Sequence, residues 1–166
     1  MSDDNVCSGV IQRVDGGHEG RLRRVYPHPP QRLWAMLTEP AEFAKWIAPG
    51  SMDLKKGGRV HMDFADSGTL IDSKLTEFQP PRLLEYAWSS GDEPARPLRW
   101  ELLPEGEGTA LTLTVFTPEG EDAAKACAGF EGHLDMLAGA LEDVPIRFPF
   151  DHFVAALKAY TEMLGQ

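Results

Sequence analysis

The sequence has few cysteines and no long apolar run, and each absence excludes a class of protein. Cys7 and Cys127 are its only two cysteines and form no CxxC pair, so neither a disulfide framework nor a zinc site is expected. No run of about 18 apolar residues occurs, and the first residues lack the basic and apolar regions of a signal peptide. We therefore expect a cytoplasmic protein without membrane insertion.

An excess of positive charge is also missing. The 166 residues include 16 Lys plus Arg against 26 Asp plus Glu, a net charge of −10. Duplex nucleic acids and anionic membranes attract clustered Lys and Arg, so no nucleic-acid partner is expected. A chain of this length can bury about 70% of its unfolded surface. We predict a flexible tail over residues 1–8 and a single domain over residues 9–166.

The first third of the chain predicts a hairpin and two short helices. Residues 9–26 alternate around Asp15-Gly16-Gly17, which is typical of a tight hairpin turn. Prolines open both helices, and Pro40 also ends the first. Their apolar residues fall at helical spacing: Leu33, Trp34 and Leu37 in the first, and Phe43, Trp46 and Ile47 in the second, which Pro49-Gly50 ends.

From Ser51 to Pro118 the pattern has a period of two, which indicates strands with one buried face. The alternating apolar residues are Val60, Met62 and Phe64; Leu84, Tyr86 and Trp88; Leu98, Trp100 and Leu102; and Leu111, Leu113 and Val115. Short turn-forming links, such as Asp66-Ser67-Gly68, separate successive strands and predict an antiparallel meander.

Helical spacing returns after Pro118. Phe130, Leu134, Leu137 and Leu141 form one stripe of a long helix. A final helix carries Phe153, Leu157, Tyr160 and Leu164, with Asp151 as its N-cap and Gly165 as its stop. A twisted sheet must bury its apolar face, and the long helix can cover it. The fold class is therefore α+β.

Five motifs in this order resemble a known family. They are RRVYPHPPQRLWAMLTEPAEFAKWIAP, DLKKGGRV, FQPPRLLEYAW, LRWELLPEGEGTALTLT and AGFEGHLDMLAGALE. From Gly9 to about Tyr160 the chain resembles the START-like, or SRPBCC, helix-grip superfamily, in the branch named after the activator of the heat-shock chaperone's ATPase. The resemblance implies a curved antiparallel β-sheet wrapped around a long C-terminal helix, with two short helices after the first strand. It also implies an apolar cavity, which the superfamily uses for lipids, sterols and polyketides.

Aromatic and apolar residues on the inner faces are the candidate ligand-binding residues. With this cavity in mind, we predict that it is lined by Met62, Phe64, Tyr86, Trp88, Trp100, Phe130, His133, Leu134 and Leu137. The alternative is that these residues fill the core completely, and the resemblance favours the cavity. Phe130 stands where relatives commonly have Trp, and Val115 stands where a polar His is common.

His133 is the one weak catalytic candidate. It borders the apolar stripe, so it can donate a hydrogen bond to a ligand carbonyl or act as a general base. The alternative is a structural histidine bonded to a strand or to water. Its possible carboxylate partners, Asp63, Asp72, Glu85 and Glu101, alternate onto the outer faces of their strands.

Motifs for catalysis and metal binding are otherwise missing. The sequence has no GxSxG, HExxH or P-loop, and its five histidines lack metal-ligand spacing, so we expect them in solvent and predict no metal and no cofactor. Binding of a small hydrophobic molecule is the favoured function. The alternatives are an enzyme of polyketide-cyclase or hydrolase type and a chaperone-interaction or stress-response module. Phe116, Phe148 and Phe150 can form an apolar patch suited to a homodimer.

Overall fold

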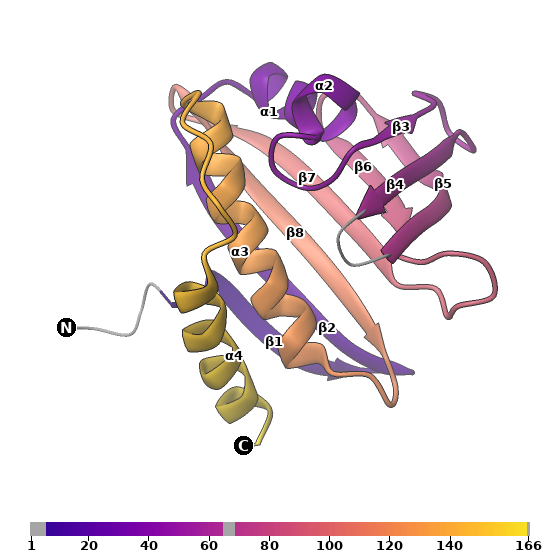
Figure 1. Cartoon of the computed structure of the whole chain (residues 1–166), viewed down its shortest axis with the longest axis vertical. Helices are drawn as coiled ribbons and strands as arrows, with labels where there is room; N and C mark the ends of the chain where they lie inside the picture. The colour runs from indigo at the N-terminus through magenta and orange to yellow at the C-terminus, as the bar shows by residue number, and fades with distance from the viewer. Residues whose placement is uncertain (1–5, 65–68, 166) are drawn as a thin grey trace.

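An antiparallel sheet of eight strands, in the order β1-β2-β8-β7-β6-β5-β4-β3, forms one layer of the computed structural model (Figure 1). The structure describes residues 6–64 and 69–165. The strands are β1 (Gly9–Val14), β2 (Gly17–Tyr26), β3 (Gly50–Met52), β4 (Arg59–Phe64), β5 (Thr69–Gln79), β6 (Leu83–Ala87), β7 (Pro97–Glu105) and β8 (Gly108–Pro118). The helices are α1 (Pro30–Thr38), α2 (Pro40–Phe43), α3 (Ala123–Leu141) and α4 (Phe150–Leu164). The predicted turn Asp66-Ser67-Gly68 and residues 1–5 of the predicted tail lie outside the described residues.

The opening hairpin and the two short helices form where the sequence predicts them. The hairpin turns at Gly16, whose φ of 82° is a conformation that favours glycine. The second helix is shorter than predicted, because α2 ends at Phe43 instead of continuing to Pro49. The backbone N–H groups of Trp46, Ile47 and Ala48 all donate to the carbonyl of Phe43, which makes tight turns in place of a continuing helix. The side chains of Phe43, Trp46 and Ile47 are nevertheless buried.

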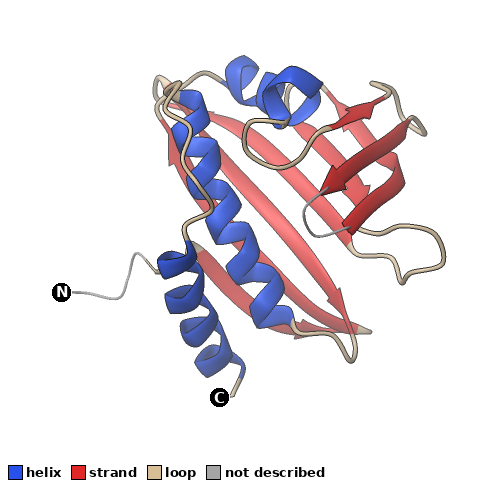
Figure 2. Ribbon diagram, viewed as in Figure 1, coloured by secondary structure: helices blue, strands red, loops and turns tan. Residues whose placement is uncertain are grey.

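The helices gather on one face of the sheet (Figure 2). Helix α3 packs on β2 and β8, and α4 packs on α3 and β1. The predicted stripe of α3 is buried at all four positions, Phe130, Leu134, Leu137 and Leu141. The fold is thus the predicted α+β arrangement of a curved sheet and a long C-terminal helix.

The ends of α3 and α4 differ in how they are capped. Asp122 caps α3 by accepting a hydrogen bond from the backbone N–H of Lys125 at 3.0 Å. The prediction that Asp151 caps α4 was wrong, because the helix begins two residues earlier. Pro149 is the N-cap, its carbonyl accepts from the N–H of Phe153, and Asp151 lies in the first turn. Within the described ranges, none of the helices is both long and apolar enough to cross a membrane.

Candidate functional site

Two adjoining hollows follow one flank of α3, and together we call them the α3 cleft. The first encloses about 270 Å³ and is lined by Phe64, Trp88, Lys125, Ala126, Gly129, Phe130 and His133. The second encloses about 260 Å³, shares Trp88, Lys125, Ala126 and Phe130 with the first, and extends toward Leu98 and Val115. Most of the exposed surface inside both hollows belongs to apolar atoms. The cleft is therefore suited to an apolar ligand.

Small residues on α3 create the space in the cleft. Ala126 and Gly129 occupy successive turns of the helix flank, and a Cβ atom placed on Gly129 would meet no atom within 4 Å. Aromatic rings form the facing walls: Trp88 meets Phe130 edge-on at 5.4 Å between ring centroids, and Phe64 meets Trp88 at 5.7 Å. These rings hold one another in edge-to-face geometry, which stabilises the walls beyond their burial alone.

The nine predicted ligand-binding residues divide between the cleft and the core. Phe64, Trp88, Phe130 and His133 line the first hollow. The other five are packed in the core, each at most 2% exposed: Met62, Tyr86, Trp100, Leu134 and Leu137. Large rings fill the space between sheet and helix there, since Trp46 and Trp100 meet edge-on at 5.7 Å. The open space thus lies beside the predicted stripe of α3 and not directly under it.

Sequence reasoning missed Lys125, Ala126 and Gly129 as lining residues. The apolar stripe predicts only the face of α3 that packs against the sheet. A signal for the flank was present, because Ala126 and Gly129 lie one turn apart beside the aromatic Phe130. Short side chains next to a large ring leave volume that the ring alone does not fill.

His133 is held in place by the loop after α2. Its Nδ1 lies 3.0 Å from the carbonyl oxygen of Trp46. Burial lowers the pKa of His133, and the hydrogen bond to Trp46 offsets this only in part. The ring of His133 also borders a third hollow of about 560 Å³, which Asp63, Phe148 and Phe150 help to line. His133 is therefore a neutral, oriented imidazole at neutral pH.

The four carboxylates considered as partners of His133 form no catalytic pair with it. Asp72 accepts from Arg59 at 3.1 Å, and Glu85 accepts from Arg99 at 3.1 Å on the outer side of the sheet. Glu101 lies 3.6 Å from the same Arg99. Asp63 shares the third hollow with His133, but within residues 6–64 and 69–165 the two make no hydrogen bond. None of these four carboxylates thus orients the candidate base.

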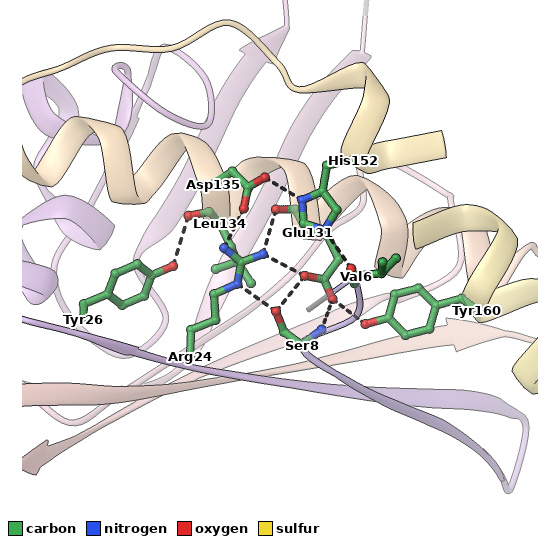
Figure 3. A network of polar contacts seen from close by, with 9 residues as sticks. All are labelled: Val6, Ser8, Arg24, Tyr26, Glu131, Leu134, Asp135, His152 and Tyr160. Carbon is green, nitrogen blue, oxygen red and sulfur yellow. Dashed lines mark hydrogen bonds and ion pairs between the residues drawn. The ribbon is translucent and has the colours of Figure 1, made fainter. Parts of the chain in front are cut away.

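A polar network between α3, α4 and the strand β2 was not predicted (Figure 3). Glu131 is fully buried and accepts hydrogen bonds from the N–H of Ser8 at 2.5 Å, the guanidinium of Arg24 at 2.7 Å and the hydroxyl of Tyr160 at 2.6 Å. Asp135, one turn later, also binds Arg24 at 2.7 Å. A buried carboxylate is tolerated when it is paired and hydrogen-bonded in this way. The network joins the N-terminal segment, β2, α3 and α4.

His152 completes the network, and its role is structural. Its Nδ1 faces Asp135 and its Nε2 faces the backbone carbonyl of Val6 at 2.7 Å. Because both nitrogens are engaged, neither is available to activate Ser8 as a nucleophile, although Ser, His and Asp are close together. The expectation of solvent-exposed histidines was wrong, because His152 and the other four histidines are all partly buried. Val6 and Ser8, within the predicted tail, are bonded to α4 and α3.

The cysteines and the acidic side chains supply no metal site in the part of the chain that the structure describes, where no three potential ligands come together. Cys7 and Cys127 are free thiols. Burial, with the charge of Glu131 nearby, raises the pKa of Cys7 to about 11 and that of Cys127 to about 12. Thiols with raised pKa values are poor nucleophiles at neutral pH.

A larger hollow on the opposite face of the sheet has a more polar lining than the α3 cleft. It encloses about 590 Å³ and is lined largely by charged side chains of β2, β7 and β8. These charges already pair with one another: Arg23 of β2 with Glu105 of β7 at 2.7 Å, and Arg21 with Glu19 along β2 at 3.4 Å. Since its cations are neutralised by neighbouring carboxylates, this face offers less to a ligand than the α3 cleft.

Solved structures share this arrangement of sheet and helices. CalU16 from Micromonospora echinospora superposes with a TM-score of 0.78 at 20% identity, covering 96% of this chain and 98% of that one. A conserved protein of unknown function from Enterococcus faecalis, EF2215, superposes with a TM-score of 0.81 at 18% identity, covering 98% and 94%. DynU16, from the dynemicin biosynthetic locus, has a TM-score of 0.69 at 27% identity, covering 76% of this chain and 48% of DynU16. The matched part is thus about half of DynU16.

The sequence comparison agrees with the fold. No curated protein matches the chain closely enough to count as a relative. Residues 27–142, from the end of β2 to the end of α3, match the family model described as Activator of Hsp90 ATPase homolog 1-like protein. The chain therefore belongs to this family and has its START-like helix-grip fold.

Proposed function

We propose that this protein binds a small hydrophobic molecule in the α3 cleft. The observation that carries the proposal is an open apolar space beside Gly129, walled by Phe64, Trp88 and Phe130. The two hollows of about 270 and 260 Å³ adjoin, and small-molecule sites typically occupy about 300–1,000 Å³. Binding draws its free energy from apolar surface removed from water, about 25 cal/mol per Å².

One structural neighbour supports a small-molecule partner. DynU16 is described as a protein of the dynemicin biosynthetic locus, and it shares 27% identity with this chain over the matched part. Its place in a biosynthetic locus motivates the proposal of a small-molecule partner for this chain. For this chain the proposal concerns only the class of ligand, a small apolar molecule that fits the walls of the α3 cleft.

Binding without chemistry fits the site better than catalysis. An enzyme of cyclase or hydrolase type would use His133 as its base and would need a second polar group to orient it or to stabilise charge. The only side chain or backbone group bonded to His133 in the described ranges is the Trp46 carbonyl. The rings of Phe64, Phe130 and Phe148 flank the imidazole, and its remaining surface lines the first and third hollows.

Two further proposals concern the setting of the protein. Two free cysteines fit a reducing compartment, and we propose a cytoplasmic location. The ring centroids of Phe148 and Phe150 lie 5.0 Å apart, and Phe150 is 69% exposed. These rings support the proposal of a homodimer through this surface. Phe116, the third residue of the predicted patch, instead lines the α3 cleft.

A substitution that fills the cleft with a larger side chain tests the proposal. Gly129→Leu places a side chain in space that is empty, so the variant should fold and lose the cleft. Ala155→Leu adds the same side chain at an exposed position of α4 and serves as the control. We expect the neutral dye N-phenyl-1-naphthylamine to bind the wild type and the control, with fluorescence enhancement, and to bind Gly129→Leu at least tenfold more weakly.

Native mass spectrometry of the freshly purified protein provides the second measurement. An apolar molecule of defined mass, retained by the wild type and lost in Gly129→Leu, would identify the natural ligand. Equal binding of the dye to all three proteins would overturn the proposal, because the dye would then occupy another surface.

A further inference from the structure

The hydrogen bond to Trp46 decides which nitrogen of His133 carries a proton. The carbonyl oxygen of Trp46 lies 3.0 Å from Nδ1 and can only accept a hydrogen bond. Nδ1 must therefore be the donor, and in the neutral ring Nε2 carries a lone pair and no proton. Trp46 is itself fixed, since its indole N–H donates to the carbonyl of Met36 at 2.9 Å. The tautomer is thus set by a rigid backbone group.

Nothing around His133 in the described residues satisfies the lone pair of Nε2. The ring centroids of Phe64, Phe130 and Phe148 lie 6.2, 6.2 and 5.5 Å from that of the imidazole, and phenyl rings carry no hydrogen-bond donor comparable to N–H or O–H. His133 nevertheless lines the α3 cleft, so a bound molecule can reach its ring. The first hollow therefore presents one oriented side-chain acceptor, the imidazole of His133, beside its aromatic walls.

We infer that the ligand of the α3 cleft is an aromatic or otherwise apolar molecule bearing a hydroxyl or N–H group, which donates a hydrogen bond to Nε2 of His133. This inference rests on the proposed function, because it concerns the same cleft. It reverses one of the two functional roles expected from the sequence, in which His133 donates to a ligand carbonyl. A ligand that carries only a carbonyl or ether oxygen would face a lone pair with another lone pair and would bind more weakly.

Three naphthalenes of similar size and shape separate the hydrogen bond from the apolar contacts. 2-Naphthol donates a hydrogen bond, 2-methoxynaphthalene can only accept one, and 2-methylnaphthalene does neither. Their affinities are measured by displacement of N-phenyl-1-naphthylamine from the wild type and from His133→Phe, which keeps an aromatic ring but has no acceptor nitrogen. Circular dichroism and thermal unfolding verify that the variant is folded.

We expect the wild type to bind 2-naphthol about two- to tenfold more tightly than the other two compounds, the range of one neutral hydrogen bond. In His133→Phe this preference should disappear while the apolar compounds still bind. Equal affinity of all three compounds for the wild type, or a preference that persists in His133→Phe, would overturn the inference and leave the proposed function intact. If the dye bound the wild type but none of the compounds displaced it, the inference would fall and the proposed function would stand. If the dye itself failed to bind the wild type, the proposed function would fall as well.

The tautomer gives a test that needs no variant. ¹⁵N-detected NMR of the wild-type imidazoles reports whether Nδ1 or Nε2 carries the proton. We expect His133 to be protonated at Nδ1 alone, and its Nε2 resonance to move on addition of 2-naphthol but not of 2-methylnaphthalene. A ring protonated at Nε2 in the free protein would contradict the inference directly.

Discussion

His152 and Asp135 face each other across 2.5 Å, measured from Nδ1 of the imidazole to Oδ2 of the carboxylate (Figure 3). On the other side of the ring, Nε2 lies 2.7 Å from the carbonyl of Val6. Both neighbours are acceptors, so both nitrogens can be satisfied only when the ring is protonated. Burial lowers the pKa of His152, but the hydrogen bonds to Asp135 and Val6 and the charge of Glu131 together raise it above its ordinary value of 6.5.

This arrangement predicts a loss of stability at alkaline pH. A proton held more tightly in the folded state stabilises that state, fully below pH 6.5 and progressively less as the pH rises through the folded-state pKa. We expect the free energy of unfolding of the wild type to exceed that of His152→Gln most below pH 6.5, and the difference to shrink as the pH rises.

Urea unfolding of both proteins at a series of pH values measures the effect, with His18→Gln as the control outside the network. Arg24 also belongs to the network, but its guanidinium, whose pKa is raised above its ordinary value, keeps its charge across this range. A difference between wild type and His152→Gln that stays constant from acid to alkaline pH would show that the ring acts only through packing.

The buried carboxylate of Glu131 predicts a large mutational effect. Its side chain is 0% exposed and holds Arg24, Ser8 and Tyr160 together, so Glu131→Gln leaves the guanidinium without its fully buried counter-ion. We expect a loss of about 3–5 kcal/mol in the free energy of unfolding, the cost of breaking a buried ion pair by removing one partner.

An exposed ion pair gives the matched control for Glu131. Arg13 and Glu119 lie 3.1 Å apart with side chains 67% and 58% exposed. Glu119→Gln should cost at most about 1 kcal/mol, because solvent screens such pairs. Chemical denaturation of both variants measures their losses in the free energy of unfolding. Equal losses would mean that the network contributes no more to stability than a surface pair.

The polar network also shows where reasoning from sequence stops. The strand alternation and the stripe of α3 are local patterns. The α+β fold class could therefore be predicted from the sequence, in which Leu113 belongs to a strand alternation and Leu134 to a helical stripe. Glu131 lies within the long helix, but its partners Ser8 and Arg24 are 123 and 107 residues away in the sequence. Such pairs are brought together by the fold, and no local pattern identifies them.

The candidate site could be predicted only in part from the sequence. Aromatic residues at the right phase identified Phe64, Trp88 and Phe130 as lining residues. The sequence could not distinguish these from Trp100 and Tyr86, which have the same phase but fill the core. Whether a ring borders open space depends on the size of the residue opposite it, here Gly129, and that neighbour is known only from the structure.

Two glycines of α3 provide a direct test of where the space is. A Cβ atom on Gly129 would enter the open cleft, whereas a Cβ atom on Gly132 would lie 2.5 Å from the ring of Phe148. Alanine is favoured over glycine inside a helix by about 1 kcal/mol. We expect Gly129→Ala to raise the free energy of unfolding by up to about that amount. Gly132→Ala should lower it, because the ring of Phe148 must leave its place against the helix.

Urea unfolding of the two alanine variants compares them in the same helix, three residues apart. The gain in helix propensity is common to both, so their difference reports the room available at each position. A destabilised Gly129→Ala would mean that the helix flank is already in contact with another part of the chain. The space that the proposed ligand needs would then be absent, and the proposal of a binding cleft beside Trp88 and Phe130 would have to be given up.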